Sequence, residues 1–289
     1  MIKITDVRAN AGDSAFLLDD GESAILYDTG FAYTGARVAE NVGRVLGERR
    51  LDAILLTHSH YDHAAGAPYI KRAYPEAQIV AGEYAARIFS KPTARSLMRE
   101  LDRRAALADG IEAYEDLIDE LSVTCTVADG EALSVGRMRI ETLSLPGHTK
   151  CSVGYYLPEE GLLLSSETLG VFNGTDDVVP AYLVGVKMSL DAISRVKALS
   201  PRSILLPHFG VIEGETVERY LSLASTRAEE VARVVSQMLA AHKNKEEIQA
   251  WFEREFYHGA IVDCYPIDAM RLNTKIMIDL IERELSNHA

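Results

Sequence analysis

The segment LDAILLT, residues 51–57, is a short and nearly continuous apolar run. Such a run is typical of a strand that is buried on both faces of a sheet. A helix-like pattern precedes it in ARVAENVGRVL, residues 36–46, and another follows it in AAGAPYIKRAY, residues 64–74. Strand and helix therefore alternate here, which predicts sheets with helices on their outer faces.

Further strands are predicted on both sides of this region. MIKITDV, SAFLLDD and SAILYDTG are strand-like segments in the first 30 residues, and AQIVAG follows at 77–82. A second strand-rich stretch runs from SVTCTV at 122–127 to SVGYYLPEEGLLLSSET at 152–168, where PEEG predicts a hairpin turn. Residues 83–122 are charged and helical in spacing, and they predict a helical insertion that serves as a lid or as a dimer face.

The last third of the chain is predicted to be mainly helical. MSLDAISRVKAL, residues 188–199, favours a helix capped by Ser189, and PRSILLPHFG at 201–210 favours a closing strand. Apolar residues recur every three or four positions between Val217 and Met238, as on one face of a long helix. Asn244 and Glu247 resemble a capping box, and a last helix is predicted over 267–285. We therefore predict an α/β domain over 1–213 and a helical extension over 214–289 packed on it.

Charge and composition exclude several classes of function. The chain has 30 basic and 43 acidic residues, and its net charge of -13 disfavours nucleic acid as a partner. No uncharged apolar run reaches 18 residues and the N-terminus lacks a signal-peptide core, so we expect a cytoplasmic protein that does not bind membranes. Cys125, Cys151 and Cys264 form no CxxC pair and are predicted to be free thiols.

The segment HSHYDH, residues 58–63, directly follows the apolar run. Side chains two positions apart on an extended segment point the same way, so His58 and His60 can project to one side. A turn that begins at Tyr61 can bring Asp62 and His63 to the same place. Three imidazoles and one carboxylate at this spacing suit one or two metal ions, whereas the alternative is a set of surface-turn histidines.

Two further histidines also follow apolar strands. His148 lies in LSLPGHTK, and His208 lies in ILLPHFG. Loops at strand ends carry functional side chains on a rigid support. These two histidines are therefore additional candidate metal ligands.

HSHYDH resembles the HxHxDH signature of the metallo-β-lactamase superfamily. The resemblance covers about residues 1–212, and it includes Asp28-Thr29-Gly30, His148 in PGHT, a carboxylate after GLLLSS, and His208. It implies an αββα four-layer sandwich with metals at one edge of the two sheets. One metal would be held by His58, His60 and His148, and a second by Asp62, His63 and His208. Asp28 would orient ligands or organise the loop, with an ordinary turn aspartate as the alternative.

Glu167 departs from the family pattern, because most members have an aspartate that bridges the two metals at this position. Glutamate is longer by one C–C bond, about 1.5 Å, and it reaches a metal if the backbone lies further back. The alkylsulfatase branch of the superfamily also uses glutamate ligands. We therefore expect Glu167 to ligate at least one metal.

The resemblance implies a hydrolase with two divalent ions, for which zinc is the expected metal and iron and manganese are the alternatives. The ions would generate a metal-bound hydroxide, and Asp62 would orient it and pass its proton to the leaving group. A small-molecule thioester, lactone or phosphoester is the expected substrate, and the helical extension is similar to that of glyoxalase II-like enzymes. The alternatives are an iron-dependent oxygen- or persulfide-using oxidoreductase and a non-catalytic metal-binding scaffold.

Substrate contacts are only weakly indicated by the sequence. The candidates lie after Glu167 and in the break between two tail helices, and they are Asn173, Tyr182, Lys187, Tyr257 and His258. Each has an alternative interpretation as an ordinary core or surface residue. The apolar stripe of the tail can pack on its own domain or on a second subunit, so a homodimer is left open.

Overall fold

The computed structural model describes residues 2–288, and they form two compact units. The first unit contains the chain up to Ser144 together with Cys151–Leu164, and the second contains Leu145–Lys150 together with the chain from Ser165 onward. The boundary that the sequence suggests, between residues 213 and 214, falls inside the second unit. It lies in the turn between the last strand and the longest helix.

The first unit is organised around a six-stranded mixed sheet. Its strands lie in chain order, and they are β1 (Lys3–Asp6), β2 (Phe16–Asp19), β3 (Ala24–Tyr27), β4 (Ala53–Leu56), β5 (Gln78–Gly82) and β6 (Cys125–Val127). β1 to β3 pair antiparallel, whereas β3 to β6 pair parallel. All four residues of β4 are buried, as the apolar run predicts.

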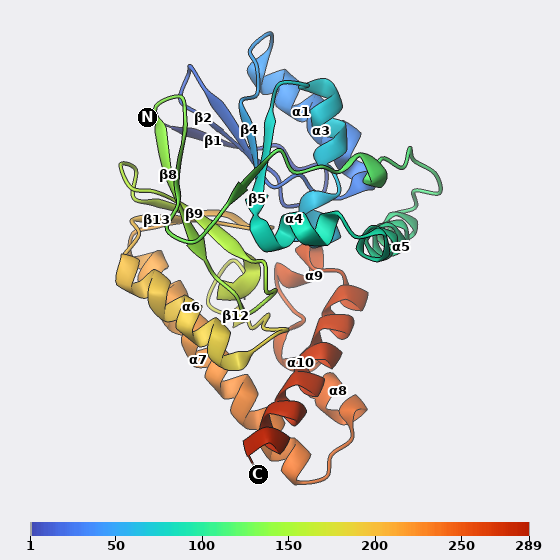
Figure 1. The fold of residues 1–289 in the computed structure, drawn as a ribbon. Helices are drawn as coiled ribbons and strands as arrows, with labels where there is room; N and C mark the ends of the chain where they lie inside the picture. Colours follow the sequence, from blue (N-terminus) through green and yellow to red (C-terminus); the bar gives the residue numbers. More distant parts are fainter. Residues whose placement is uncertain (1, 289) are drawn as a thin grey trace. The chain divides into compact units, whose positions relative to one another are not determined.

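Helices of the first unit pack beside this sheet (Figure 1). They are α1 (Ala32–Leu46), α2 (Tyr61–Ala64), α3 (Ala67–Ala73), α4 (Glu83–Phe89), α5 (Pro92–Ala108) and the short 3₁₀ helix η1 (Ile118–Glu120). The single helix predicted over 64–74 is interrupted before Ala67. At Gly66 an added Cβ would lie 2.1 Å from the Thr29 carbonyl oxygen, so this close approach of two backbone segments requires glycine.

The insertion at 83–122 is only partly helical, because residues 111–117 form no regular element. Its contacts hold it against α1 and the N-terminal loop. The Asp102 carboxylate accepts a hydrogen bond from the backbone N–H of Ala32 at 2.7 Å. Asp109 accepts hydrogen bonds from the hydroxyl of Tyr33 at 2.7 Å and from the amide of Asn10 at 3.0 Å.

Four antiparallel strands of the first unit belong to a second sheet. They are β7 (Ala132–Val135), β8 (Met138–Ser144), β9 (Val153–Leu157) and β10 (Leu162–Leu164), and β9 and β10 form the hairpin that PEEG predicts. The hydroxyl of Tyr155 on β9 donates to the carbonyl of Leu56 at the end of β4, at 2.8 Å. The backbone N–H of Val153 donates to the Thr57 carbonyl at 2.9 Å. These bonds join β9 to the end of β4.

The second unit contains short strands and most of the long helices. Its elements are η2 (Glu167–Leu169), β11 (Val171–Phe172), β12 (Val178–Val179), α6 (Val186–Leu199), β13 (Ser203–Leu206), β14 (Gly210–Glu213), α7 (Glu215–Ala240), α8 (Lys245–Phe256), α9 (Ile261–Cys264) and α10 (Ile267–His288). α7, α8 and α10 pack together, as the orange and red helices of Figure 1 show. The apolar stripe from Val217 onward is buried in α7, which confirms the predicted long helix.

Two local predictions in this unit have different outcomes. The capping box of α8 is confirmed, because the Asn244 side chain accepts from the Glu247 N–H and the Glu247 side chain accepts from the Asn244 N–H. The cap predicted at Ser189 is wrong: α6 begins at Val186, and Ser189 is a buried residue of its interior. Among residues 2–288, no helix has both the length and the apolar character of a membrane span.

Candidate functional site

Asp28 and Thr57 follow the neighbouring parallel strands β3 and β4, at the carboxyl ends where α/β sheets bind ligands. The Asp28 N–H donates to the Leu55 carbonyl at 2.9 Å. The buried Asp28 carboxylate accepts the Thr57 N–H at 2.9 Å and the Ser14 hydroxyl at 3.0 Å. Its backbone φ of 52° lies in the left-handed region, which aspartate adopts more readily than most residues.

His63 is held by the same carboxylate. Its Nδ1 lies 2.7 Å from Oδ2 of Asp28, and both side chains are fully buried. The His63 carbonyl oxygen accepts hydrogen bonds from the N–H and the hydroxyl of Thr29, each at 2.8 Å. Because an ionised carboxylate can only accept, Nδ1 carries the proton, and Nε2 of the neutral ring offers a lone pair.

His58 is oriented through Thr57. The Thr57 hydroxyl lies 3.0 Å from Nδ1 of His58 and 3.0 Å from Oδ2 of Asp28. A hydroxyl has one proton, and the carboxylate accepts it, so the hydroxyl oxygen accepts the N–H of His58 in turn. The Nε2 atom of His58 is therefore also a lone-pair donor.

His60 and Asp62 are partly exposed beside these buried rings. The ring centroids of His58 and His60 are 4.6 Å apart, and those of His58 and His63 are 4.1 Å apart. Asp62 Oδ2 lies 3.6 Å from Nε2 of His63. The first unit thus brings the three imidazoles and the carboxylate of HSHYDH together, and α2, which begins at Tyr61, makes the turn.

The second unit gathers His148, Glu167 and His208, all of which are buried. Nδ1 of His148 lies 2.6 Å from the carbonyl oxygen of Ala181, and its Nε2 lies 2.8 Å from Oε2 of Glu167. A carbonyl oxygen can only accept, so the His148 proton lies on Nδ1. Oε1 of Glu167 lies 3.5 Å from Nε2 of His208, and the Glu167 carboxylate therefore faces both imidazoles.

Backbone contacts position these side chains. The Thr168 hydroxyl donates to the Leu145 carbonyl at 2.6 Å and accepts the His148 N–H at 3.3 Å. At Gly147 an added Cβ would lie 2.1 Å from the Ser189 hydroxyl oxygen, so α6 packs directly against this turn. Thr57 and Thr168 are absent from the predicted site, and the only signal for either is a hydroxyl residue next to a candidate ligand.

The donor atoms fit divalent metal ions. Imidazole nitrogens and carboxylate oxygens are the ligands that zinc and similar borderline ions prefer, and thiolates are not needed. Metal-ligating histidines typically donate their other N–H to a carboxylate or a backbone carbonyl. His63 and His148 each have such a partner within their own unit.

The weaker substrate-contact candidates occupy varied places in the second unit. The Asn173 side chain accepts three backbone N–H bonds in the turn after β11. The Tyr182 ring is buried near the Ala228 carbonyl, and Lys187 is exposed and paired with Asp191. Tyr257 follows α8 and is half-buried, and exposed His258 contacts the Glu255 carbonyl. Their predicted role in substrate binding stays a prediction.

Comparisons with known proteins agree with this geometry. The model of the metallo-beta-lactamase superfamily matches residues 12–232. Glyoxylase B2 of Dictyostelium discoideum is 28% identical over 145 residues, 50% of this chain and 45% of that protein. Hydroxyacylglutathione hydrolase of Legionella pneumophila (strain Paris) is 27% identical over 131 residues, 43% of this chain and 39% of that protein. The chain thus matches less than half of the length of either relative.

Solved structures show the same fold. The crystal structure of the metallo-beta-lactamase family protein TTHA1429 from Thermus thermophilus superposes with a TM-score of 0.61. The sequences are 22% identical, and the match covers 94% of this chain and 88% of that one. The predicted fold class, with two sheets and helices of the metallo-β-lactamase type, is confirmed.

Proposed function

Because this chain belongs to the metallo-beta-lactamase superfamily, we propose that it is a metal-dependent hydrolase of a small-molecule substrate. One observation carries the proposal. His58 and His63 each have Nδ1 occupied by a partner inside the first unit, so each ring offers Nε2 as a lone-pair donor, and Nδ1 of His148 is likewise occupied by the Ala181 carbonyl in the second unit. A histidine set fixed in this tautomer suits metal binding better than a structural hydrogen-bond role.

The proposed ligands comprise the half-sites of both units. His58, His60 and His148 would hold one ion, Asp62, His63 and His208 the second, and Glu167 would ligate at least one of them. Zinc is the proposed metal on the basis of the nitrogen and oxygen donors. Bound divalent ions would acidify a water molecule and polarise the scissile bond of the substrate.

The chain's own residues have separate tasks in this proposal. Asp28 and Thr57 hold the rings of His63 and His58, so the ligand geometry exists before substrate arrives. Asp62 is partly exposed, unlike the buried Glu167, and its carboxylate can accept a proton and return it to a leaving group. His60 is also partly exposed and lies on the solvent-accessible part of the first half-site.

A thioester is the proposed substrate class. The support is the name of one relative, hydroxyacylglutathione hydrolase, together with the match of this chain to part of that protein. A thiolate leaves more readily than an alkoxide. The cleavage of a thioester would therefore depend less on proton transfer from Asp62 to the leaving group than the cleavage of an oxygen ester would. Lactones and phosphodiesters are the comparison substrates in the test.

The test combines a substrate panel with a matched pair of histidine variants. Wild-type protein loaded with zinc is assayed on a thioester, a lactone and a phosphodiester, and the thioester is expected to react fastest. His60→Ala should lower kcat/KM by about 100-fold or more, whereas His242→Ala, an exposed histidine after α7, should leave it unchanged. Equal activity of the two variants would refute the assigned site, and no turnover of any substrate would favour a non-catalytic scaffold.

A further inference from the structure

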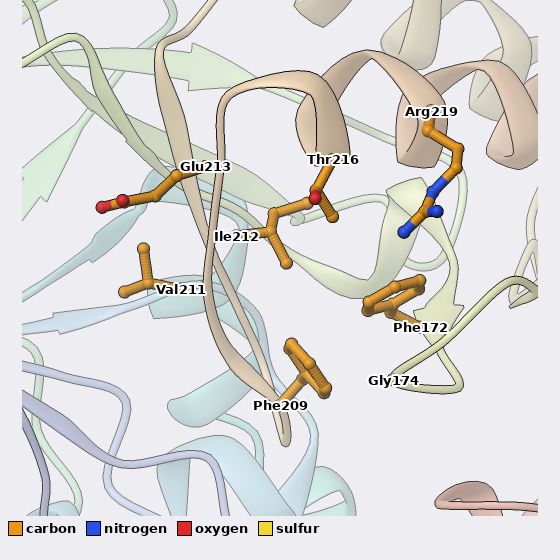
Figure 2. Close-up of a pocket in the computed structure, with 8 residues that line it drawn as sticks. All are labelled: Phe172, Gly174, Phe209, Val211, Ile212, Glu213, Thr216 and Arg219. Atoms are coloured by element: carbon orange, nitrogen blue, oxygen red, sulfur yellow. The ribbon is translucent and has the colours of Figure 1, made fainter.

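A shallow hollow of about 460 Å³, called the cavity below, is open to solvent in the second unit (Figure 2). Its volume is within the range of sites that hold small organic ligands. The lining comes from β11, β14 and α7 and from the turns beside them, and it consists of Phe172, Gly174, Phe209, Val211, Ile212, Glu213, Thr216 and Arg219. None of the seven proposed metal ligands lines it.

Aromatic rings form one wall of this cavity. The rings of Phe172 and Phe209 meet edge to face with centroids 4.9 Å apart, and the rings of Phe172 and Tyr220 also meet edge to face, at 5.6 Å. Gly174 has a φ of 86°, and a Cβ there would lie 3.1 Å from the Phe209 ring. The glycine therefore allows the turn to approach the ring. Such a wall suits a flat apolar group, because aromatic pairs gain from edge-to-face and offset contacts.

Arg219 supplies the positive charge of the cavity. Figure 2 shows its guanidinium reaching from α7 toward Phe172. One nitrogen donates to the Thr175 carbonyl at 3.2 Å, and no carboxylate of residues 2–288 forms an ion pair with it. The remaining N–H donors suit a carboxylate, which guanidinium binds through two parallel hydrogen bonds. Thr216, which is also on α7, lines the cavity as well.

Nearby acidic residues restrict the charge of the ligand. Val211 and Glu213 point away from the face of β14 that carries Ile212, as alternation along a strand requires (Figure 2). Glu213 is one of the lining residues, and Glu215 and Glu218 lie in the first turn of α7, the helix that carries Thr216 and Arg219. A phosphate dianion would be repelled more strongly than a single carboxylate.

We propose that this cavity binds an organic monocarboxylate with an aromatic or similarly flat apolar body. The apolar body contacts Phe172, Phe209 and Ile212, and the carboxylate pairs with Arg219. Phe209 directly follows the proposed ligand His208, but none of the proposed ligands belongs to the lining, so the cavity and the metal ligands are tested with different variants.

Phenylacetate is the probe, and its binding to zinc-loaded protein is measured by isothermal titration calorimetry. Saturable binding is expected, and the neutral analogue phenylacetamide should bind with an affinity at least about tenfold lower. Arg219→Gln should weaken phenylacetate binding by a similar factor, and it is a safe substitution because Arg219 is exposed. Arg233→Gln removes the same charge from an exposed position on α7 outside the cavity, and it should bind like wild type.

Two more measurements separate this cavity from the metal ligands and from phosphate chemistry. His60→Ala should bind phenylacetate with an unchanged dissociation constant if the ligand binds in the cavity. If the carboxylate of the ligand instead binds to metal, this variant should lose affinity for it. Phenyl phosphate should bind more weakly than phenylacetate. The proposal is overturned if wild-type protein shows no saturable binding, if Arg219→Gln binds like Arg233→Gln, if His60→Ala abolishes binding, or if phenyl phosphate binds more tightly.

Discussion

Asp28 and His63 form a fully buried pair in which Oδ2 of the carboxylate lies 2.7 Å from Nδ1 of the imidazole. The same carboxylate accepts the N–H of Thr57, whose hydroxyl orients His58. One buried side chain at the end of β3 thereby orients His58, which lies just after β4, and His63, which lies in α2. This relationship underlies the proposal that the first half-site is preorganised for metal.

Asp28→Asn should lower metal affinity by about 10–100-fold. An amide has only one acceptor oxygen, so its NH₂ group would face either the Nδ1–H of His63 or the N–H of Thr57. The measurement is a competitive chelator titration. Asp13→Asn is the matched control, because Asp13 is also buried and accepts N–H bonds from Ala9, Asn10 and Phe31. It should reduce stability and leave metal affinity unchanged, and equal affinity in both variants would contradict the role of Asp28.

Gly66→Ala should destabilise the protein by about 3 kcal/mol. The added methyl group would overlap the Thr29 carbonyl, which is backbone and cannot rotate away. Gly43→Ala is the control in the interior of α1, where the nearest atom is the Tyr74 hydroxyl at 3.5 Å. Removing a flexible glycine from a helix should stabilise by about 0.5–1 kcal/mol. Chemical denaturation measures the free energy of unfolding of both variants. A Gly66→Ala variant as stable as wild type would show that the backbone segments at Gly66 and Thr29 separate easily.

The candidate ligands can be predicted from the sequence because the patterns that indicate them involve only neighbouring residues. The alternation of His58 and His60 along an extended segment, and the strand ends before His148 and His208, can be read from neighbouring residues alone. The hydrogen bonds that orient the rings are different, because Asp28 and His63 are 35 positions apart in the chain and meet only in the folded sheet. No sequence pattern near Thr57 predicts that its hydroxyl lies between the side chains of Asp28 and His58.

The ends of helices also differ in how well the sequence predicts them, because some depend on neighbouring residues and others on tertiary contacts. The capping box at Asn244 is encoded within four residues, and it was predictable. Ser189 has the residue type of a cap, but α6 begins at Val186, and Ser189 is buried in the helix against the Gly147 turn. In the insertion, charged residues with helical spacing predict helical structure over 83–122. Residues 111–117 instead lie without regular structure between α5 and η1.

Asp102 should make stability depend on pH. Burial raises the pKa of this carboxyl from 3.8 to about 6, so the folded state binds the proton more tightly than the unfolded chain does. The contribution of Asp102 to stability should therefore fall as pH rises from about 4 to 6, by about 2–3 kcal/mol in total. Asp102→Asn keeps an acceptor for the Ala32 N–H and should remove this dependence and raise stability at pH 7.

The control for this experiment is Asp119→Asn, an exposed substitution in the same insertion. It should retain the wild-type fall in stability between pH 4 and 6. Urea denaturation at a series of pH values measures all three proteins. Parallel pH profiles for wild type and Asp102→Asn would show that Asp102 is not the group responsible.

Glu167→Gln should weaken metal binding by about tenfold or more. The carboxylate faces the Nε2 atoms of His148 and His208, and an amide would place a neutral group, with one N–H donor end, between them. Glu213→Gln is the control, since Glu213 is exposed in the same unit and outside the proposed ligand set. Metal dissociation constants that are the same for both variants would remove Glu167 from that set.

Elemental analysis of protein purified without added metal is the most direct test of the central claim, that these histidines and carboxylates hold metal. We predict two divalent ions per chain, mainly zinc, and a lower ratio after Asp28→Asn. Wild-type protein that contains no divalent metal, and takes up none on dialysis against zinc, would contradict the claim. An iron-containing, coloured preparation that consumes oxygen would contradict the hydrolase assignment.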